Sequence, residues 1–296
     1  MTTDRSPAAA TSLFEPAGPD RWTPTELARG PWDPRACHGG PVSALLARAV
    51  ECVDPDSPVD WQIARLSIEL TRPVPVGTPL TVSTEIERDG RKVSLVAVRL
   101  HDGDTEVARA RSLRIRAKPL ALSDDVVQPT PDPPGSPADG IAQRVTWAVD
   151  DHVAFHKDAC EYRFTEGTWD TPGPVGVWIR LCVPVVPSEE PSGVQRAAAT
   201  ADFGNGISAG MPFDRFTFIN PDLTVHLLRS PVGEWIGMRT ASHYGTASAS
   251  SGAGFAESAL YDADGRLGRS VQSLILDERR ISRETSTNRR EPDGVL

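Results

Sequence analysis

The sequence is poor in lysine and has no excess of basic residues. Only three of its 296 residues are lysine, its 40 acidic residues outnumber its 31 basic ones, and its formal net charge is -9. Broad binding to nucleic acid or to an anionic membrane surface needs a basic footprint. No apolar run approaches the ~20 residues of a membrane-spanning helix. The composition therefore argues against both nucleic acid and a membrane as partners.

Cysteine is also scarce. The four cysteines, Cys37, Cys52, Cys160 and Cys182, form no CxxC pair, and residues 1–20 contain no apolar core of the kind found in secretion signals. Disulfide bonds are typical of secreted proteins and rare in the cytosol. We therefore expect reduced thiols and a cytoplasmic location.

Three short motifs imitate known sites without the context that those sites need. His152, His156 and Cys160 have a helical spacing that could hold zinc, but they lack the Glu of an HExxH motif. Residues 262–265 (DADG) match part of a calcium loop, but no EF-hand glutamate follows. Residues 206–210 match GxSxG, but a helical run precedes them instead of the strand that a serine hydrolase has there. We expect no metal ion and no cofactor.

The strongest pattern that the sequence does contain lies in residues 30–53. Apolar residues recur at helical spacing from Pro41 to Cys52, and few polar residues interrupt them, so we expect a helix that other elements enclose. Pro41 suits the first helical position, and Gly39 and Gly40 let backbone or ligand approach the unpaired N–H groups of the helix start. The positive end of the helix dipole would stabilise a developing negative oxygen there.

Four strand-like runs follow this helix, at residues 61–71, 79–88, 92–101 and 106–117. Their alternation and the intervening Asp-Gly pairs indicate antiparallel hairpins. One long helix followed by antiparallel strands is typical of an α+β domain in which a curved sheet covers the helix. Further on, a helix rich in small residues is expected at residues 193–203, with strands at 160–166, at 175–186 and from 216 onward.

These elements and the composition between them suggest two domains. The expected organisation is an N-terminal tail (residues 1–20), a first domain (21–117), a linker rich in Pro, Asp and Ser (118–143), a second domain (144–278) and a charged C-terminal tail (279–296).

The second domain repeats the first. Residues 66–77 (LSIELTRPVPVG) align with residues 223–233 (LTVHLLRSPVG), 157 positions further on, and Arg111-Ser112-Leu113 aligns with Gln272-Ser273-Leu274. Matching order and spacing favour an internal duplication. Applied to the first helix, the offset of 157 places Leu45 opposite Asp202. A carboxylate therefore stands in the second copy where the first has an apolar residue.

Asp202 has two interpretations. Residues 197–204 (AAATADFG) are typical of a helix end that Gly204 caps. Aspartate is common in such turns, where it can simply accept hydrogen bonds from nearby backbone N–H groups. The alternative is that Asp202 is a catalytic carboxylate.

Four segments carry a resemblance to a known family: Trp32 with His38–Leu45 (HGGPVSAL), Ala201–Gly206 (ADFGNG), Glu234-Trp235 and Tyr261–Leu274 (YDADGRLGRSVQSL). Over roughly residues 20–278 the chain resembles the thioesterase-like superfamily of tandem hot-dog proteins, near the acyl-CoA thioesterase II type. The resemblance implies a double hot-dog fold, in which two domains of one helix and one antiparallel sheet form an internal pseudo-dimer.

The resemblance also implies a set of catalytic residues. Asp202 falls on the family's acidic position and Gln272 on its glutamine, which together with a hydroxyl residue hold the attacking water. Ser242 is the first choice for that hydroxyl, and Thr240 and Thr246 remain alternatives. The N–H groups around Gly39 and Gly40 are candidates for the oxyanion site, whereas His38 either contacts the thioester or only caps the helix.

The activity implied is hydrolysis of an acyl-CoA, or of an acyl-carrier-protein thioester, to the free acid. A non-catalytic acyl-thioester binder is the alternative, because the hydroxyl residue is not clearly present. A hot-dog hydratase is a further alternative. The sequences of such enzymes contain an Asp followed by an Asn-Pro-x-His pattern, and here Leu223 stands where that His should be, which counts against this class. Homo-oligomerisation is compatible with the sequence.

Overall fold

The computed structural model describes residues 10–123, 125–126, 132–145, 152–245 and 251–279. Along the chain the elements are β1 (Phe14–Gly18), β2 (Arg21–Pro24), the 3-10 turn η1 (Glu26–Ala28), α1 (Gly39–Glu51), β3 (Trp61–Glu69), β4 (Leu80–Asp89), β5 (Val93–Asp102), β6 (Thr105–Arg116), β7 (Ile141–Gln143), α2 (Phe155–Asp158), β8 (Cys160–Glu166), β9 (Val175–Leu181), α3 (Gly193–Ala201), α4 (Gly204–Ile207), β10 (Phe216–Ile219), β11 (Asp222–Leu227), β12 (Trp235–His243), β13 (Ala253–Asp262) and β14 (Gly265–Glu278). None of the helices in these residues is long and apolar enough to cross a membrane.

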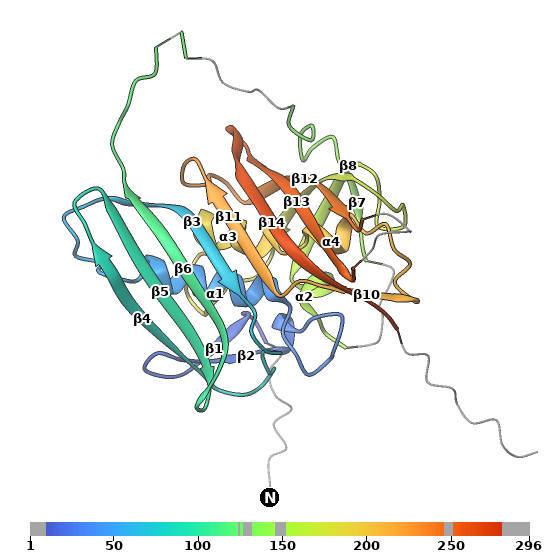
Figure 1. The fold of residues 1–296 in the computed structure, drawn as a ribbon, viewed down its shortest axis with the longest axis horizontal. Helices are drawn as coiled ribbons and strands as arrows, with labels where there is room; N and C mark the ends of the chain where they lie inside the picture. Colours follow the sequence, from blue (N-terminus) through green and yellow to red (C-terminus); the bar gives the residue numbers. More distant parts are fainter. Residues whose placement is uncertain (1–9, 124, 127–131, 146–151, 246–250, 280–296) are drawn as a thin grey trace, which may run out of the picture.

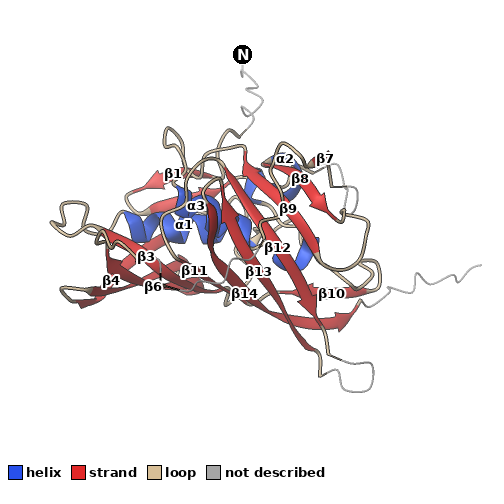
Figure 2. Ribbon diagram, turned by 90° about the horizontal axis from the view of Figure 1, so that it is seen from above, coloured by secondary structure: helices blue, strands red, loops and turns tan. Residues whose placement is uncertain are grey.

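One continuous sheet runs through the described part of the chain and curves around the helices (Figures 1 and 2). Its strand order is β1-β2-β4-β5-β6-β3-β11-β14-β13-β12-β9-β8-β7, with β10 beside β14. The order β4-β5-β6-β3 in the first half recurs as β12-β13-β14-β11 in the second. Each half is thus one long helix covered by an antiparallel sheet, which confirms the predicted α+β, double hot-dog architecture.

The two halves meet at strands β3 and β11, at the centre of the sheet. Ser67 lies opposite Thr224, its counterpart in the repeat. The flanking pairs are related crosswise by the same repeat: Leu66 with Val225, and Ile68 with Leu223. A pseudo-two-fold axis therefore passes between Ser67 and Thr224, as it would in a dimer whose subunits use the same surface.

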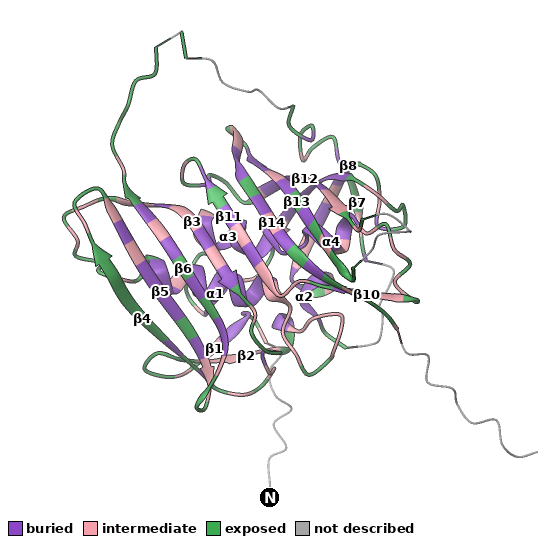
Figure 3. Cartoon of the chain, viewed as in Figure 1, coloured by how far each residue is buried: buried purple, intermediate pink, exposed green. Residues whose placement is uncertain are grey.

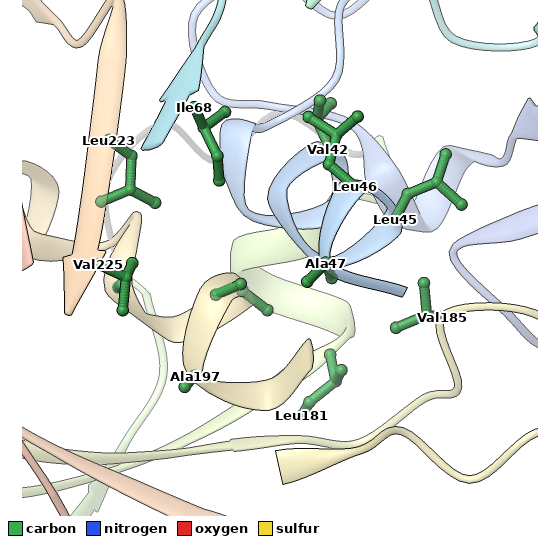
Figure 4. Packing of buried hydrophobic residues seen from close by; sticks show 14 of the residues in the cluster. Val42, Leu45, Leu46, Ala47, Ile68, Leu181, Val185, Ala197, Leu223 and Val225 are labelled. Atoms are coloured by element: carbon green, nitrogen blue, oxygen red, sulfur yellow. The ribbon is translucent and has the colours of Figure 1, made fainter. Parts of the chain in front are cut away.

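The two long helices pack against each other in opposite directions beneath this junction. His38, the cap of α1, lies against Asp202 at the end of α3, and Ser192, the cap of α3, bonds Glu51 at the end of α1. Ten of the 13 residues of α1 are buried. The helix is accordingly largely purple in Figure 3. In Figure 4 its apolar side chains lie between residues of the central strands and the chain around Val185. Each fully buried leucine contributes about 1.5–3 kcal/mol.

The structure differs from the expected N-terminal tail. Residues 14–18 form β1, and Leu13 and Phe14 are fully buried. The backbone N–H groups of Leu13 and Phe14 donate to the carbonyls of Pro184 and Val185 at 3.0 and 2.9 Å, so this segment is attached to the second half of the chain. Two apolar residues among polar neighbours show no period, which is why the sequence pattern did not reveal the strand.

The end of the expected linker also belongs to the fold. Residues 141–143 form β7 and pair with β8, and the indole Nε1 of Trp178 donates to the carbonyls of Pro134 and Gly135 at 3.3 and 3.2 Å. At the other end of the second domain, the Arg279 N–H donates to the Arg215 carbonyl at 2.8 Å. The rest of the predicted C-terminal tail, residues 280–296, lies outside the described residues.

The alignment of the two helices differs from the predicted one. The helix caps His38 and Ser192 are 154 positions apart, three fewer than the offset in the sheet. When the two helices are aligned by their capping residues, Asp202 corresponds to Arg48 and not to Leu45. Loops between the elements absorb such differences in length.

The predicted alignment of the last strands is wrong by one residue. Ser67 and Thr224 are equivalent in the repeat, so their partners in the sheet are also equivalent. Ser67 pairs with Arg111, and Thr224 pairs with Val271. Gln272 therefore corresponds to Ser112 and not to Arg111. Side chains alternate between the two faces of a strand, so a slip of one residue would have put a buried residue on the outer face.

An ion pair at the β13–β14 turn leads to a prediction about acid stability. Asp262 accepts two hydrogen bonds of 2.5 Å from the Arg229 guanidinium, and its side chain is fully buried. Burial raises the pKa of Asp262, but the hydrogen bonds from Arg229 and from the Val232 and Asp264 N–H groups outweigh that effect and lower it. The Asp-x-Asp-Gly motif thus closes a hairpin around an ion pair.

We expect Arg229→Gln to lower the free energy of unfolding at pH 7 by ~3 kcal/mol, because it leaves the buried Asp262 carboxylate without its charged partner. The pKa of Asp262 is lowered in the folded state. The ion pair therefore stabilises the protein fully above pH ~3.9, the pKa of Asp in the unfolded chain, and this stabilisation is lost as the pH falls through the pKa of Asp262 in the folded protein. The wild type should therefore lose this stability in acid, and the variant should show a flatter profile in urea titrations from pH 7 to 3.

The exposed pair of Arg35 and Asp33 supplies a matched control. An exposed ion pair contributes only ~0–1 kcal/mol, so Arg35→Gln should leave the urea concentration at the midpoint of unfolding nearly unchanged. Equal effects of the two substitutions would contradict the role given to the Asp262 pair.

Candidate active site

A cavity of about 340 Å³ opens at the start of α1, between the two halves of the chain. Its lining is mainly apolar and includes Trp32, Val42, Leu70, Val74, Trp169, Phe203 and Ile219. Three predicted site residues also line it: His38, Gly39 and Asp202. The start of the helix from the first copy and the carboxylate from the second copy therefore meet at one cavity.

Asp202 ends α3 and is only 3% exposed. Its Oδ1 accepts hydrogen bonds from Asn220 Nδ2 at 2.8 Å and from Gln272 Nε2 at 3.2 Å. Its Oδ2 lies 2.8 Å from His38 Nδ1. A buried carboxylate needs such donors, since an uncompensated charge in the interior is costly. Asp202 is thus held by side chains from three separate segments.

Gly39 makes room for this carboxylate. A Cβ atom at this position would lie 2.7 Å from both Asp202 oxygens, which is closer than any real Cβ contact. The absence of a side chain therefore lets the carboxylate rest directly on the first turn of α1. Among the described residues, no acceptor is paired with the Gly39 N–H, so this donor is available to a ligand in the cavity.

Gln272, from β14, is 1% exposed and connects Asp202 to the turn that follows it. Its Nε2 also donates to the Asp202 carbonyl at 3.1 Å, and its Oε1 accepts from the Asn205 N–H at 3.2 Å. The structure thus brings together Asp202 and Gln272, as the resemblance implies, and in addition shows that the amide fixes the backbone around the carboxylate.

The predicted hydroxyl residue is not in contact with Asp202. Ser242 Oγ bonds Ser208 Oγ at 2.8 Å, and Thr240 Oγ1 donates to the Gly204 carbonyl at 3.1 Å. Both hydroxyls lie on β12 and hold the two ends of α4, at Gly204 and Ser208. Thr246 lies outside the described residues. The choice of Ser242 as the third member of the site is therefore not supported by the contacts.

Asn220, and not a hydroxyl residue, makes the third side-chain contact with Asp202. It precedes β11, and its Nδ2 donates to Asp202 Oδ1 and, at 3.3 Å, to the Asp222 carbonyl. Sequence reasoning considered Asn220 only as part of a hydratase pattern. The only sign of Asn220 in the sequence was an amide residue just before the repeated strand. No sequence pattern near Asn220 indicates that it contacts the end of α3.

His38 is the cap of α1, as one of its two interpretations expected. Its Nδ1 lies 3.0 Å from the Gly40 nitrogen, and its ring packs against those of Phe155 and Phe203, with centroids 5.1 and 4.9 Å away. A Cβ at Gly40 would lie 2.7 Å from the Ala199 carbonyl oxygen, so only glycine fits there. The Gly40 N–H thus faces the histidine, and the oxyanion role predicted for it needs that bond to open.

Other nucleophile candidates do not fit the geometry. Cys37 lines the cavity, but enclosure of its thiol raises its pKa well above the usual range, so it has little thiolate. Ser208, the serine of the GxSxG pattern, donates to the Gly204 carbonyl at 2.7 Å and follows the short helix α4. No group of three or more potential metal ligands occurs among the described residues.

Two family models match the chain. The acyl-CoA thioesterase N-terminal domain matches residues 28–115, and the acyl-CoA thioesterase C-terminal domain matches residues 124–276. The first match contains α1 with its glycines, and the second contains Asp202, Asn220 and Gln272. No curated protein matches the sequence.

Solved structures share the fold at low sequence identity. A TesB protein of Mycobacterium avium is 17% identical over 90% of this chain and 96% of that chain, with a TM-score of 0.61. The acyl-CoA thioesterase II TesB2 of Mycobacterium marinum is 16% identical over 91% and 96%, with a TM-score of 0.56. A hot-dog protein from Alicyclobacillus acidocaldarius is 14% identical over 88% and 93%, with a TM-score of 0.63. Because its two halves match the two domains of one family in the same order, the chain belongs to the acyl-CoA thioesterases.

Proposed function

We propose that this protein hydrolyses acyl-CoA thioesters to the free acid and CoA by direct attack of water. One observation carries the proposal: a buried carboxylate, Asp202, lies at the first turn of α1 beside an apolar cavity. Hydrolysis needs a negative group to activate water and N–H donors for the oxyanion that forms. The Asp202 carboxylate and the Gly39 N–H, which line the same cavity, support these two roles.

The cavity suits an acyl chain. Its inner walls are aromatic and aliphatic, with Trp32, Trp169 and Phe203 among the lining residues. Ligand pockets of this kind bind apolar groups and use a few polar atoms for orientation. With the acyl chain in the cavity, the thioester carbonyl would meet the Gly39 N–H, whose contribution as an oxyanion donor would be ~3 kcal/mol.

Release of free thiol tests the proposal directly. Purified protein should release CoA thiol from a series of saturated acyl-CoAs of increasing length, measured with a thiol-reactive dye, and no metal ion should need to be added. The same acyl groups attached to a carrier protein should be assayed in parallel, to decide between the two carriers of the thioester.

Two results would contradict hydrolysis. Saturable binding of acyl-CoA by calorimetry with no release of thiol would favour the non-catalytic binder, to which the missing hydroxyl contact points. Absence of both binding and turnover throughout the series would remove acyl thioesters as the ligand.

A further inference from the structure

His38 has two neighbours that make opposite demands on one ring nitrogen. Nδ1 lies 3.0 Å from the Gly40 nitrogen, which can only donate, and 2.8 Å from Asp202 Oδ2. A neutral imidazole nitrogen carries either a hydrogen or a lone pair in the ring plane, never both. The two contacts are therefore alternatives, and the chemistry of Asp202 decides between them.

A hydrogen must lie between Nδ1 and Oδ2. At 2.8 Å, a lone pair facing a carboxylate oxygen would be repulsive, so one of the two atoms is protonated. Asp202 Oδ1 accepts two amide hydrogen bonds, so the carboxyl group acts as an acceptor toward its other neighbours. The contacts thus assign the hydrogen to Nδ1, and the lone pair of the ring to Nε2.

Nε2 is the ring atom that remains for chemistry. Among the described residues it has no hydrogen-bond partner, and His38 lines the cavity. The rings of Phe155 and Phe203 fix the orientation of the imidazole. Both Asp202 oxygens, by contrast, already have partners.

We propose that His38 Nε2 is the general base of the hydrolysis and that Asp202 orients the imidazole and stabilises it once charged. The inference rests on the proposed function. The proton of the attacking water goes to His38, whereas the sequence suggested Asp202 as its direct acceptor. Asp202 and His38 then act as a carboxylate–histidine pair.

The proposed steps balance as follows. Water gives a proton to Nε2 while its oxygen forms a bond to the thioester carbon, and the carbonyl electron pair moves to the oxygen. The oxyanion then re-forms the carbonyl, the C–S bond breaks, and the imidazolium returns the proton to the departing thiolate. Of the two glycine N–H groups at the start of α1, only that of Gly39 belongs to the cavity lining, so it is the donor that meets the oxyanion.

Substitution of His38 by Asn tests this assignment against a merely structural one. Asparagine is a good helix cap, and its amide can donate to Asp202 while its oxygen accepts from Gly40, but it has no basic nitrogen. We expect His38→Asn to keep the melting temperature and the KM, and to lower kcat by ~10²–10⁴-fold. In His38→Ala, added imidazole should restore part of the lost turnover.

Three outcomes would contradict these assignments, and they separate the role of His38 from the proposed function. A kcat for His38→Asn within a few-fold of wild type, with Asp202→Asn inactive, would overturn the role of His38 and leave hydrolysis at Asp202 in place. Full activity in both variants would overturn the site itself. Failure of imidazole to restore any turnover in His38→Ala, together with a wild-type-like His38→Asn, would reduce His38 to a cap.

Discussion

Asp202→Asn is expected to lower kcat for acyl-CoA hydrolysis by ~10³-fold or more, which corresponds to ~4 kcal/mol of transition-state stabilisation. The substitution keeps the shape of the side chain and removes its negative charge. An asparagine has an NH₂ group in place of one carboxylate oxygen. At least one of the three donors, from His38, Asn220 and Gln272, would then face another donor. It could neither hold Nδ1–H of His38 in the same tautomer nor balance the charge that develops during attack.

The other end of the helix pair provides the control. Glu51, at the end of α1, accepts from the Ser192 hydroxyl at 2.7 Å and from Gln195 Nε2 at 2.9 Å, and so contacts the start of α3 as Asp202 contacts the start of α1. Its capping partner is a serine where Asp202 has a histidine, so this end has no base. Glu51→Gln should therefore retain wild-type turnover. If Asp202→Asn keeps more than a tenth of the activity, the carboxylate is not essential.

Gly39→Ala should lower kcat/KM by ~10²-fold and the free energy of unfolding by ~1–3 kcal/mol. The added methyl would lie 2.7 Å from both Asp202 oxygens and 2.9 Å from Cγ, and the carboxylate is enclosed on its other sides. Either the carboxylate or the first turn of α1 must move. Both movements separate the oxyanion donor from the group that activates water.

A double-mutant cycle shows whether this collision is the cause. In an Asp202→Ala background the obstructing carboxylate is absent, so Gly39→Ala should lose most of its effect on stability in urea titrations. If Gly39→Ala lowers the free energy of unfolding by the same amount in that background, the strain lies elsewhere, for instance in the backbone of the turn before α1.

Much of the fold was predictable because its signals are local. The helical period of α1 and the alternation in β3–β6 lie within single segments, and the same patterns recur after a fixed interval in the second half. Strand β1 and the exact alignment of β14 were not predictable in the same way. Two buried residues have no period, and a one-residue shift is invisible without the partner strand.

The site shows the same division. Asp202, Gln272 and Gly39 could be proposed from the repeat and the family resemblance, because each stands in a recognisable motif. Asn220 could not, because its contact with Asp202 joins the start of one strand to the end of a helix 18 positions earlier. Ser242 matched by counting along a strand, yet its hydroxyl is turned to Ser208.

By itself the sequence determined the two long helices and most of the strands, that they occur twice, and that a glycine-rich helix start and one acidic helix end are available. Only the tertiary structure decided that these two ends meet, and that His38 Nδ1 faces Asp202 at 2.8 Å. The physical reason is that hydrophobic period and capping are properties of neighbouring residues. The direction in which a side chain's lone pair points is fixed only when distant elements pack around it.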